Sequence, residues 1–146
     1  MWGVGHPRQV NANGGVGEGR REDGVASKGR LEAYETLDGS LVRELVRPER
    51  EGSVRLSLAE ALVAPGQSTR RHLHRESEEV YYVLAGEGIV EIAAKGQRVV
   101  AGEAVLIPAG AEHRVACVGA MPLRLLCACS PPYRHEDTQL TEGQLA

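Results

Sequence analysis

The chain has 146 residues, enough for one domain rather than two. Its formal net charge of −3, from 17 basic and 20 acidic residues, gives no electrostatic reason to expect nucleic acid or an anionic membrane as a partner. The apolar fraction of 42% includes no Phe and only one Trp and four Tyr, so smaller aliphatic residues must fill the core, which favours a sheet. No apolar run reaches the roughly 20 residues that a membrane-spanning helix needs.

The first 30 residues have the composition of a segment that cannot build a core of its own. Residues 1–30 contain eight glycines and almost no apolar periodicity, so burial cannot offset the entropy lost on ordering them. We predict an N-terminal extension that is flexible or held by a partner chain.

From Leu31 to about residue 130 the sequence predicts an all-β domain. Short runs of strand-forming residues are separated by Gly, Pro and Asp, as a β-barrel or sandwich requires. Asp38-Gly39 marks a hairpin because both residues tolerate positive φ, and Pro48 ends the second strand. Lys95-Gly96 marks another turn, and helices are expected to be scarce. The predicted strands cover residues 31–37, 41–46, 54–64, 69–75, 79–84, 89–93, 98–100, 104–107, 113–118 and 123–129.

The last segment, residues 131–146, is predicted to be a C-terminal tail. It opens with Pro131-Pro132, which cannot donate backbone hydrogen bonds to a ladder, and it is polar afterwards. We therefore expect it to leave the sheet and cross the surface.

The cysteines and the N-terminus both bear on the compartment. Cys117, Cys127 and Cys129 are odd in number, and the pair two residues apart on one strand would bridge only with strain. The N-terminus also lacks the order of basic, apolar and small residues typical of a signal peptide. We therefore expect a cytoplasmic protein with reduced thiols.

Four side chains that bind transition metals are spaced so that one site can use them all. His72 and His74 lie two residues apart, so on a strand both imidazoles point to one face. Glu79 follows a short turn, where an antiparallel partner strand brings its carboxylate beside them. The Pro108-Ala109-Gly110 turn reverses the chain just before His113. Three nitrogens and one oxygen suit one divalent Fe, Mn, Ni, Cu or Zn ion per chain and leave a position open for water or substrate.

The two segments that carry these residues resemble the two conserved motifs of the cupin superfamily. The first segment reads Gly66-x5-His72-x-His74-x4-Glu79-x6-Gly86, and the second reads Gly102-x5-Pro108-x-Gly110-x2-His113. The resemblance implies a small single-domain jelly-roll β-barrel (double-stranded β-helix) over residues 31–130, with the metal inside and usually as a homodimer. The family often has Asn four residues after the last histidine, and Cys117 stands there in this chain.

Strand parity suggests further catalytic candidates beside Glu79. Tyr81 shares the parity of Glu79 and is expected to face the cavity, although a buried Tyr is more often a core residue. Glu60 has the parity of the apolar residues around it, so a regular strand would point it inward as a second acid or base. A bulge or a strand-edge position is the alternative for Glu60, because unpaired buried carboxylates are rare.

Three residues are candidates for a substrate pocket. Arg70 shares the parity of His72 and could receive a substrate carboxylate, although exposed Arg is usually surface. Cys117 shares a face with His113, and its alternative role is that of a small buried hydrophobic residue. Cys127 is expected to point into the barrel together with Cys129.

These residues predict an enzyme that acts on a small-molecule substrate. A metal with an open position can polarise a bound oxygen, activate water or dioxygen, and orient a substrate. The leading hypothesis is an O2-dependent, dioxygenase-like oxidation, because many similar cupins are dioxygenases. A non-redox isomerase, epimerase, decarboxylase or lyase is the alternative, and a small-ligand binding protein without turnover is the third class.

Overall fold

The computed structural model describes Val25, Gly29 and residues 31–142. The predicted N-terminal extension therefore lies outside the described residues except at those two positions. The strands and helices of the described part are β1 (Tyr34–Glu35), β2 (Leu41–Val46), α1 (Pro48–Glu51), β3 (Ser57–Val63), β4 (His72–His74), β5 (Glu78–Ala85), β6 (Glu87–Ile92), β7 (Lys95–Val100), β8 (Ala104–Ile107), β9 (His113–Cys117), β10 (Leu123–Ser130), η2 (His135–Asp137) and β11 (Thr138–Leu140).

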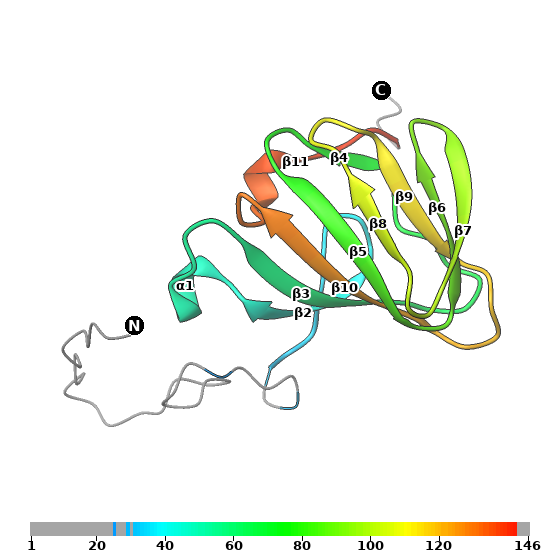
Figure 1. Cartoon of the computed structure of the whole chain (residues 1–146), viewed down its shortest axis with the longest axis horizontal. Helices are drawn as coiled ribbons and strands as arrows, with labels where there is room; N and C mark the ends of the chain where they lie inside the picture. Colours follow the sequence, from blue (N-terminus) through cyan, green and yellow to red (C-terminus); the bar gives the residue numbers. More distant parts are fainter. Residues whose placement is uncertain (1–24, 26–28, 30, 143–146) are drawn as a thin grey trace.

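Two antiparallel sheets make up the fold and confirm the all-β prediction (Figure 1). The six-stranded sheet has the order β1-β2-β3-β10-β5-β8, and the five-stranded sheet has the order β11-β4-β9-β6-β7. Strands that are distant in sequence therefore become neighbours, as when β10 pairs with both β3 and β5. Within residues 31–142, no helix has the length and apolar character needed to cross a membrane.

The core lies between the sheets and consists of aliphatic side chains, as the composition predicts. Its innermost members are less than 2% exposed. Burying each such side chain stabilises the fold by about 1.5–3 kcal/mol. Both sheets contribute to the innermost set, which comprises Ile107, Leu123, Leu125, Val83, Val90 and Val115.

Two turns show how closely the backbone follows the sequence signals. The Asp38-Gly39 hairpin is confirmed, with Gly39 at φ 86° and Tyr34 paired with Val42. Gly86, the last residue of the first motif, has φ 83°, and a Cβ atom there would lie 2.6 Å from the carbonyl oxygen of Pro122. Any other residue would clash with that backbone, so the tight link between β5 and β6 needs glycine.

Some strand boundaries differ from the prediction for identifiable reasons. Residues 31–37 keep only two strand residues, because the segment from Thr36 to Ser40 folds into a hydrogen-bonded turn. The turn before β7 is made by Ala93 and Ala94, at φ 46° and 66°, rather than by Lys95-Gly96. Gly96 instead lies in the ladder opposite Glu91.

The chain leaves the six-stranded sheet after Ser130, but the predicted tail returns to the other sheet. Thr138–Leu140 returns as β11 and pairs with β4, with Thr138 opposite His74 and Leu140 opposite His72. Without β11, strand β4 would have an open edge on this side. The three residues of β11 satisfy the backbone groups of that edge. The C-terminal segment therefore contributes directly to the strand that carries two of the predicted ligands.

Candidate metal centre

The four predicted ligands converge, and they come from both sheets. His72 and His74 on β4 and His113 on β9 belong to the five-stranded sheet, and His72 pairs directly with His113. Glu79 lies on β5 of the six-stranded sheet. All four side chains are buried, and their ligand atoms lie within 4.8 Å of one another. One ion can therefore bind all four.

The second motif places His113 through its turn. The amide of Gly110, at φ 76°, donates a 2.7 Å hydrogen bond to the carbonyl oxygen of His74. The amide of Ala111 closes the turn onto the carbonyl oxygen of Pro108 at 3.1 Å. The Pro108-to-Gly110 turn is thus tied to β4, and it delivers His113 at the start of β9 opposite His72, as predicted.

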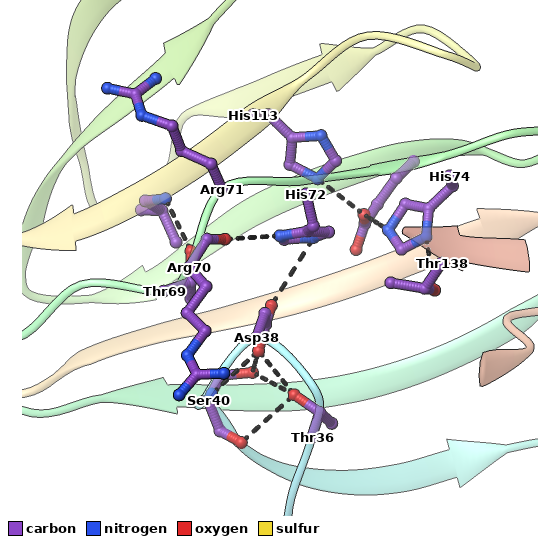
Figure 2. A network of polar contacts seen from close by, with 12 residues as sticks. Thr36, Asp38, Ser40, Thr69, Arg70, Arg71, His72, His74, His113 and Thr138 are labelled. Carbon is purple, nitrogen blue, oxygen red and sulfur yellow. Dashed lines mark hydrogen bonds and ion pairs between the residues drawn. The ribbon is translucent and has the colours of Figure 1, made fainter. Parts of the chain in front are cut away.

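Each histidine is oriented by an oxygen that accepts from its Nδ1, and Figure 2 shows this contact for His72 and His74. Nδ1 of His72 donates to the carbonyl oxygen of Arg70 at 2.8 Å, and Nδ1 of His113 donates to that of Ala111 at 2.9 Å. Nδ1 of His74 lies 2.9 Å from Oγ1 of Thr138, whose hydroxyl donates to the carbonyl oxygen of Arg134. Placing the ring proton on Nδ1 leaves Nε2 of all three imidazoles for a metal.

Two of the three Nε2 atoms face one carboxylate oxygen. Oε2 of Glu79 lies 2.9 Å from Nε2 of His74 and 3.5 Å from Nε2 of His113. Nε2 of His113 is buried and has no hydrogen-bond partner among the described residues. An imidazole nitrogen left unpaired away from water is costly. A cation bound here would accept these lone pairs, so the donor set fits a divalent transition metal.

The pKa values of the ligands follow from burial and from their mutual contacts. Burial raises the pKa of Glu79, but its close contacts with His113 and His74 outweigh burial and lower the pKa to about 2. Burial lowers the pKa of His74, yet the contact with Glu79 leaves it raised overall. The pKa of His72 is lowered by burial and by the neighbouring His113.

A buried carboxylate that sequence analysis missed fixes the turn between β4 and β5. Asp137 accepts the amide protons of Glu76 at 2.9 Å and Ser77 at 3.1 Å. These bonds lower the pKa of Asp137, although burial opposes them. The turn between His74 and Glu79 is thereby held in place by the η2–β11 segment. No local pattern in the sequence marks Asp137 for this role.

A cavity opens beside the ligands, between the two sheets. Its lining includes His72, His74, Glu79 and several small residues, and its further polar residues are Tyr34, Thr36, Asp38, Ser40, Glu44, Ser57, Thr69, Tyr81, Cys127, Cys129, Tyr133 and Thr138. Burial raises the pKa of the Tyr81 phenol and the Cys127 thiol well above their usual values. Both groups therefore keep their protons at neutral pH and act toward a ligand as neutral groups.

The other sequence candidates are divided between the cavity and its surroundings. Tyr81 and Cys127 line the cavity, as strand parity predicts, and Cys129 lines it with Cys127. Cys117 is buried but lies outside the lining, with its Sγ 3.2 Å from the carbonyl oxygen of Met121. This placement supports the role of Cys117 as a small buried hydrophobic residue. The catalytic and substrate roles assigned to these residues stay predictions.

The expected placement of Glu60 in the cavity is wrong. Glu60 lies on the opposite face of β3 from Ser57, Ala59 and Ala61, which line the cavity, and its carboxylate is 3.3 Å from Nη2 of Arg124. Most of the cavity-lining residues of β3 have odd numbers, so the even-numbered apolar residues used to judge parity mark the other face, although Leu58 also contributes to the lining.

The expected placement of Arg70 is also wrong. Arg70 precedes β4, is exposed and does not line the cavity. Its amide donates a 2.7 Å hydrogen bond to the carbonyl oxygen of Asp38, so the chain at Arg70 is bound to the β1–β2 turn rather than to a regular strand. Because the regular strand begins only at His72, strand alternation counted from His72 does not predict the direction of the Arg70 side chain.

Comparison with known proteins agrees with the fold. A sequence model of the Cupin domain family matches residues 59–129. Uncharacterized protein MJ1618 of Methanocaldococcus jannaschii is 41% identical over 113 residues, which cover 77% of this chain and 90% of that protein.

Two solved structures share the fold. The polyketide cyclase RemF from Streptomyces resistomycificus superposes with a TM-score of 0.69 at 23% identity, over 82% of this chain and 86% of that one. A protein from Thermotoga maritima described as a predicted oxalate decarboxylase superposes with a TM-score of 0.64 at 22% identity, over 72% and 96%.

Proposed function

Because this chain belongs to the cupin family, we propose that it is a metal-dependent enzyme that converts a small oxygen-bearing organic molecule by non-redox chemistry. His72, His74, Glu79 and His113 hold one divalent transition metal. The observation that carries this proposal is the buried Nε2 of His113, which has no hydrogen-bond partner among the described residues and faces the Glu79 carboxylate. When bound, the ion supplies a Lewis acid that polarises a substrate oxygen.

The residues of the cavity divide the remaining tasks. The three carbonyl or hydroxyl acceptors at Nδ1 keep the imidazoles in one tautomer, so the donor geometry is set before any ligand enters. Tyr81 lies 6.0 Å from His113, centroid to centroid, and offers a protonated hydroxyl beside the site. The apolar lining contributed by Val42, Ala61, Val63 and Leu125 excludes water from the reacting atoms.

Non-redox chemistry is supported by the described activities of the two structural neighbours. One is described as a polyketide cyclase and the other as a predicted oxalate decarboxylase, and both names denote non-redox reactions of oxygen-bearing molecules. The donor set itself accepts redox-active metals equally well. An O2-dependent oxidation is therefore the second candidate, and binding without turnover is the third.

Anaerobic turnover separates these classes. Metal-free protein would be reconstituted with Zn or with Fe and incubated without oxygen with poly-β-ketones, sugar acids and oxalate, and the products followed by mass spectrometry. We expect turnover with Zn in the wild type and none in His113→Ala. Glu60→Gln, which removes a carboxylate outside the cavity, should keep the wild-type rate.

Two other results would replace the proposal. Product that forms only with a redox-active metal, with oxygen consumed in proportion, would assign the oxidation. A compound that binds tightly and is recovered unchanged in every condition would assign a binding protein.

We also propose that the chain acts as a homodimer in the cytoplasm, on the basis of the family resemblance and the thiol content. Light scattering coupled to size exclusion tests the dimer. A particle of about twice the 15.7 kDa chain mass is expected, and a particle of one chain mass would contradict it.

A further inference from the structure

The turn between β1 and β2 presents a carboxylate to the metal centre that lies outside both cupin motifs. The turn closes through hydrogen bonds from the amide of Thr36 to the carbonyl oxygen of Ser40 at 2.9 Å and from the amide of Gly39 to that of Thr36 at 3.0 Å. At its tip, Asp38 enters the cavity lining. The hydrogen bond from the Arg70 amide anchors the same turn two residues before His72.

One oxygen of the Asp38 carboxylate is occupied by the turn itself. Oδ1 accepts hydrogen bonds from the hydroxyl of Thr36 at 2.5 Å and from the amide and hydroxyl of Ser40 at 2.9 and 2.7 Å. Three donors on one oxygen fix the plane of the carboxylate. The orientation of the other oxygen, Oδ2, is therefore determined before any ligand binds.

Oδ2 points at the metal centre. It lies 3.6 Å from Nε2 of His72, the atom that would bind the ion, and Figure 2 shows Asp38 approaching His72 from the side opposite His113. Asp38 does not belong to the group whose ligand atoms all lie within 4.8 Å of one another. It is thus beside the four ligands and available to accept a hydrogen bond from a molecule bound there.

The charges around the cavity determine how the Asp38 carboxylate affects the binding of a ligand. No Arg or Lys occurs among the described residues that line the cavity. A divalent cation with the single negative charge of Glu79 leaves one net positive charge, and Asp38 cancels it. Glu44, the third carboxylate of the lining, is paired with Arg47 at 3.0 Å. An entering anion therefore meets no net attraction, whereas a hydroxyl or N–H group meets an oriented acceptor.

We propose that Asp38 sets the specificity of the site: it selects neutral or cationic hydrogen-bond donors, such as hydroxyl compounds and amines, and disfavours carboxylates and phosphates. This inference rests on the proposed function and names its substrate class. By this chemistry, the chain should favour neutral hydroxyl compounds over a dianion such as oxalate.

Binding of two probes to the Co(II)-loaded protein tests the proposal. Co(II) binding would first be followed by visible absorption, and the loaded protein would then be titrated with oxalate, a dianion, and with imidazole, a neutral donor. Asp38→Asn keeps the hydrogen bonds at Oδ1 and removes the charge. Because it removes repulsion between like charges a few ångströms apart, we expect Asp38→Asn to bind oxalate about tenfold more tightly than the wild type and imidazole no more tightly.

A matched control and a second variant sharpen the test. Glu35→Gln removes one negative charge from the same hairpin at an exposed position outside the cavity lining, so both affinities should equal those of the wild type. Asp38→Ser keeps a polar side chain in the turn and should reproduce the gain in oxalate affinity.

The outcomes distinguish this inference from the function on which it rests. If the wild type binds Co(II) and the Asp38 variants bind oxalate no more tightly than it does, the specificity role of Asp38 is overturned while the metal centre stands. If the variants lose Co(II) binding, Asp38 supports the metal rather than selecting the substrate. If the wild type binds no Co(II) at all, both the proposed function and this inference fail.

Discussion

The two sheets contribute different chemistry to the same cavity. The five-stranded sheet supplies the nitrogen donors His72, His74 and His113, and the six-stranded sheet supplies the carboxylate of Glu79 and the hydroxyl of Tyr81. The histidines are oriented from within their own half of the site, by nearby carbonyls and by Thr138 on the adjoining β11. A bound cation would therefore join the two layers through donors from both, so metal affinity and fold stability should be linked.

The largest effect should come from removing a ligand on the histidine sheet. His113→Ala deletes a nitrogen donor whose side chain is fully buried, and we expect the affinity for Zn to fall more than about 100-fold. Isothermal titration calorimetry of the metal-free protein measures this affinity. His135→Ala, which removes an exposed imidazole outside the cavity lining, is the matched control. Equal losses in the two variants would show that His113 is not a ligand.

Metal removal tests whether the ion joins the sheets. Zn at a hundredfold excess over its Kd should stabilise the folded wild type by about 2.7 kcal/mol, which raises Tm by roughly 8 °C for a domain of this size. Differential scanning calorimetry with and without chelator gives the shift, and His113→Ala should show almost none. If the Tm of the wild type does not change when metal is added, the claim that the ion joins the two sheets is contradicted.

A smaller effect should follow from loosening one histidine without removing it. Thr138→Val deletes the acceptor at Nδ1 of His74, so the ring loses its fixed tautomer, and we expect about a tenfold loss of Zn affinity. Thr141→Val, at an exposed position just beyond β11, should leave the affinity unchanged. If both variants behave alike, the C-terminal strand has no part in orienting the ligand.

The smallest effect should be the acid sensitivity of the metal-free protein. The pKa of Glu79 is lowered to about 2 in the fold from its usual 4.5, so its stabilising contribution is present above pH 4.5 and is lost as pH falls toward 2. Urea unfolding at several pH values should show this loss in the wild type and not in Glu79→Gln. Glu78→Gln, at the exposed neighbouring position, should keep the wild-type profile, and the same loss in Glu79→Gln would assign it to other groups.

The ligands were predictable because their geometry is local. His72 and His74 are two residues apart on one short strand, and the Pro108 turn fixes where His113 begins its strand. These relations depend on strand alternation and turn chemistry, which sequence carries directly. The all-β fold followed from the same signals together with the family resemblance.

The surroundings of the site were less predictable because they depend on tertiary approach. Asp38 reads as a hairpin residue, and nothing near it in the sequence indicates that its turn reaches His72. Thr138 and Asp137 lie beyond two prolines that suggest an exit from the sheet. Glu60 was misplaced for a different reason, because the apolar residues used to judge parity mark the face of β3 opposite most of its cavity-lining residues.

Anomalous X-ray diffraction from crystals of the Zn-loaded protein tests the central claim most directly, namely that donors from both sheets share one cation. We expect a single peak per chain, bonded to Nε2 of the three histidines and to a carboxylate oxygen of Glu79. A peak coordinated elsewhere, or no peak between the two sheets in protein that retains Zn, would contradict the metal centre and the chemistry proposed for it.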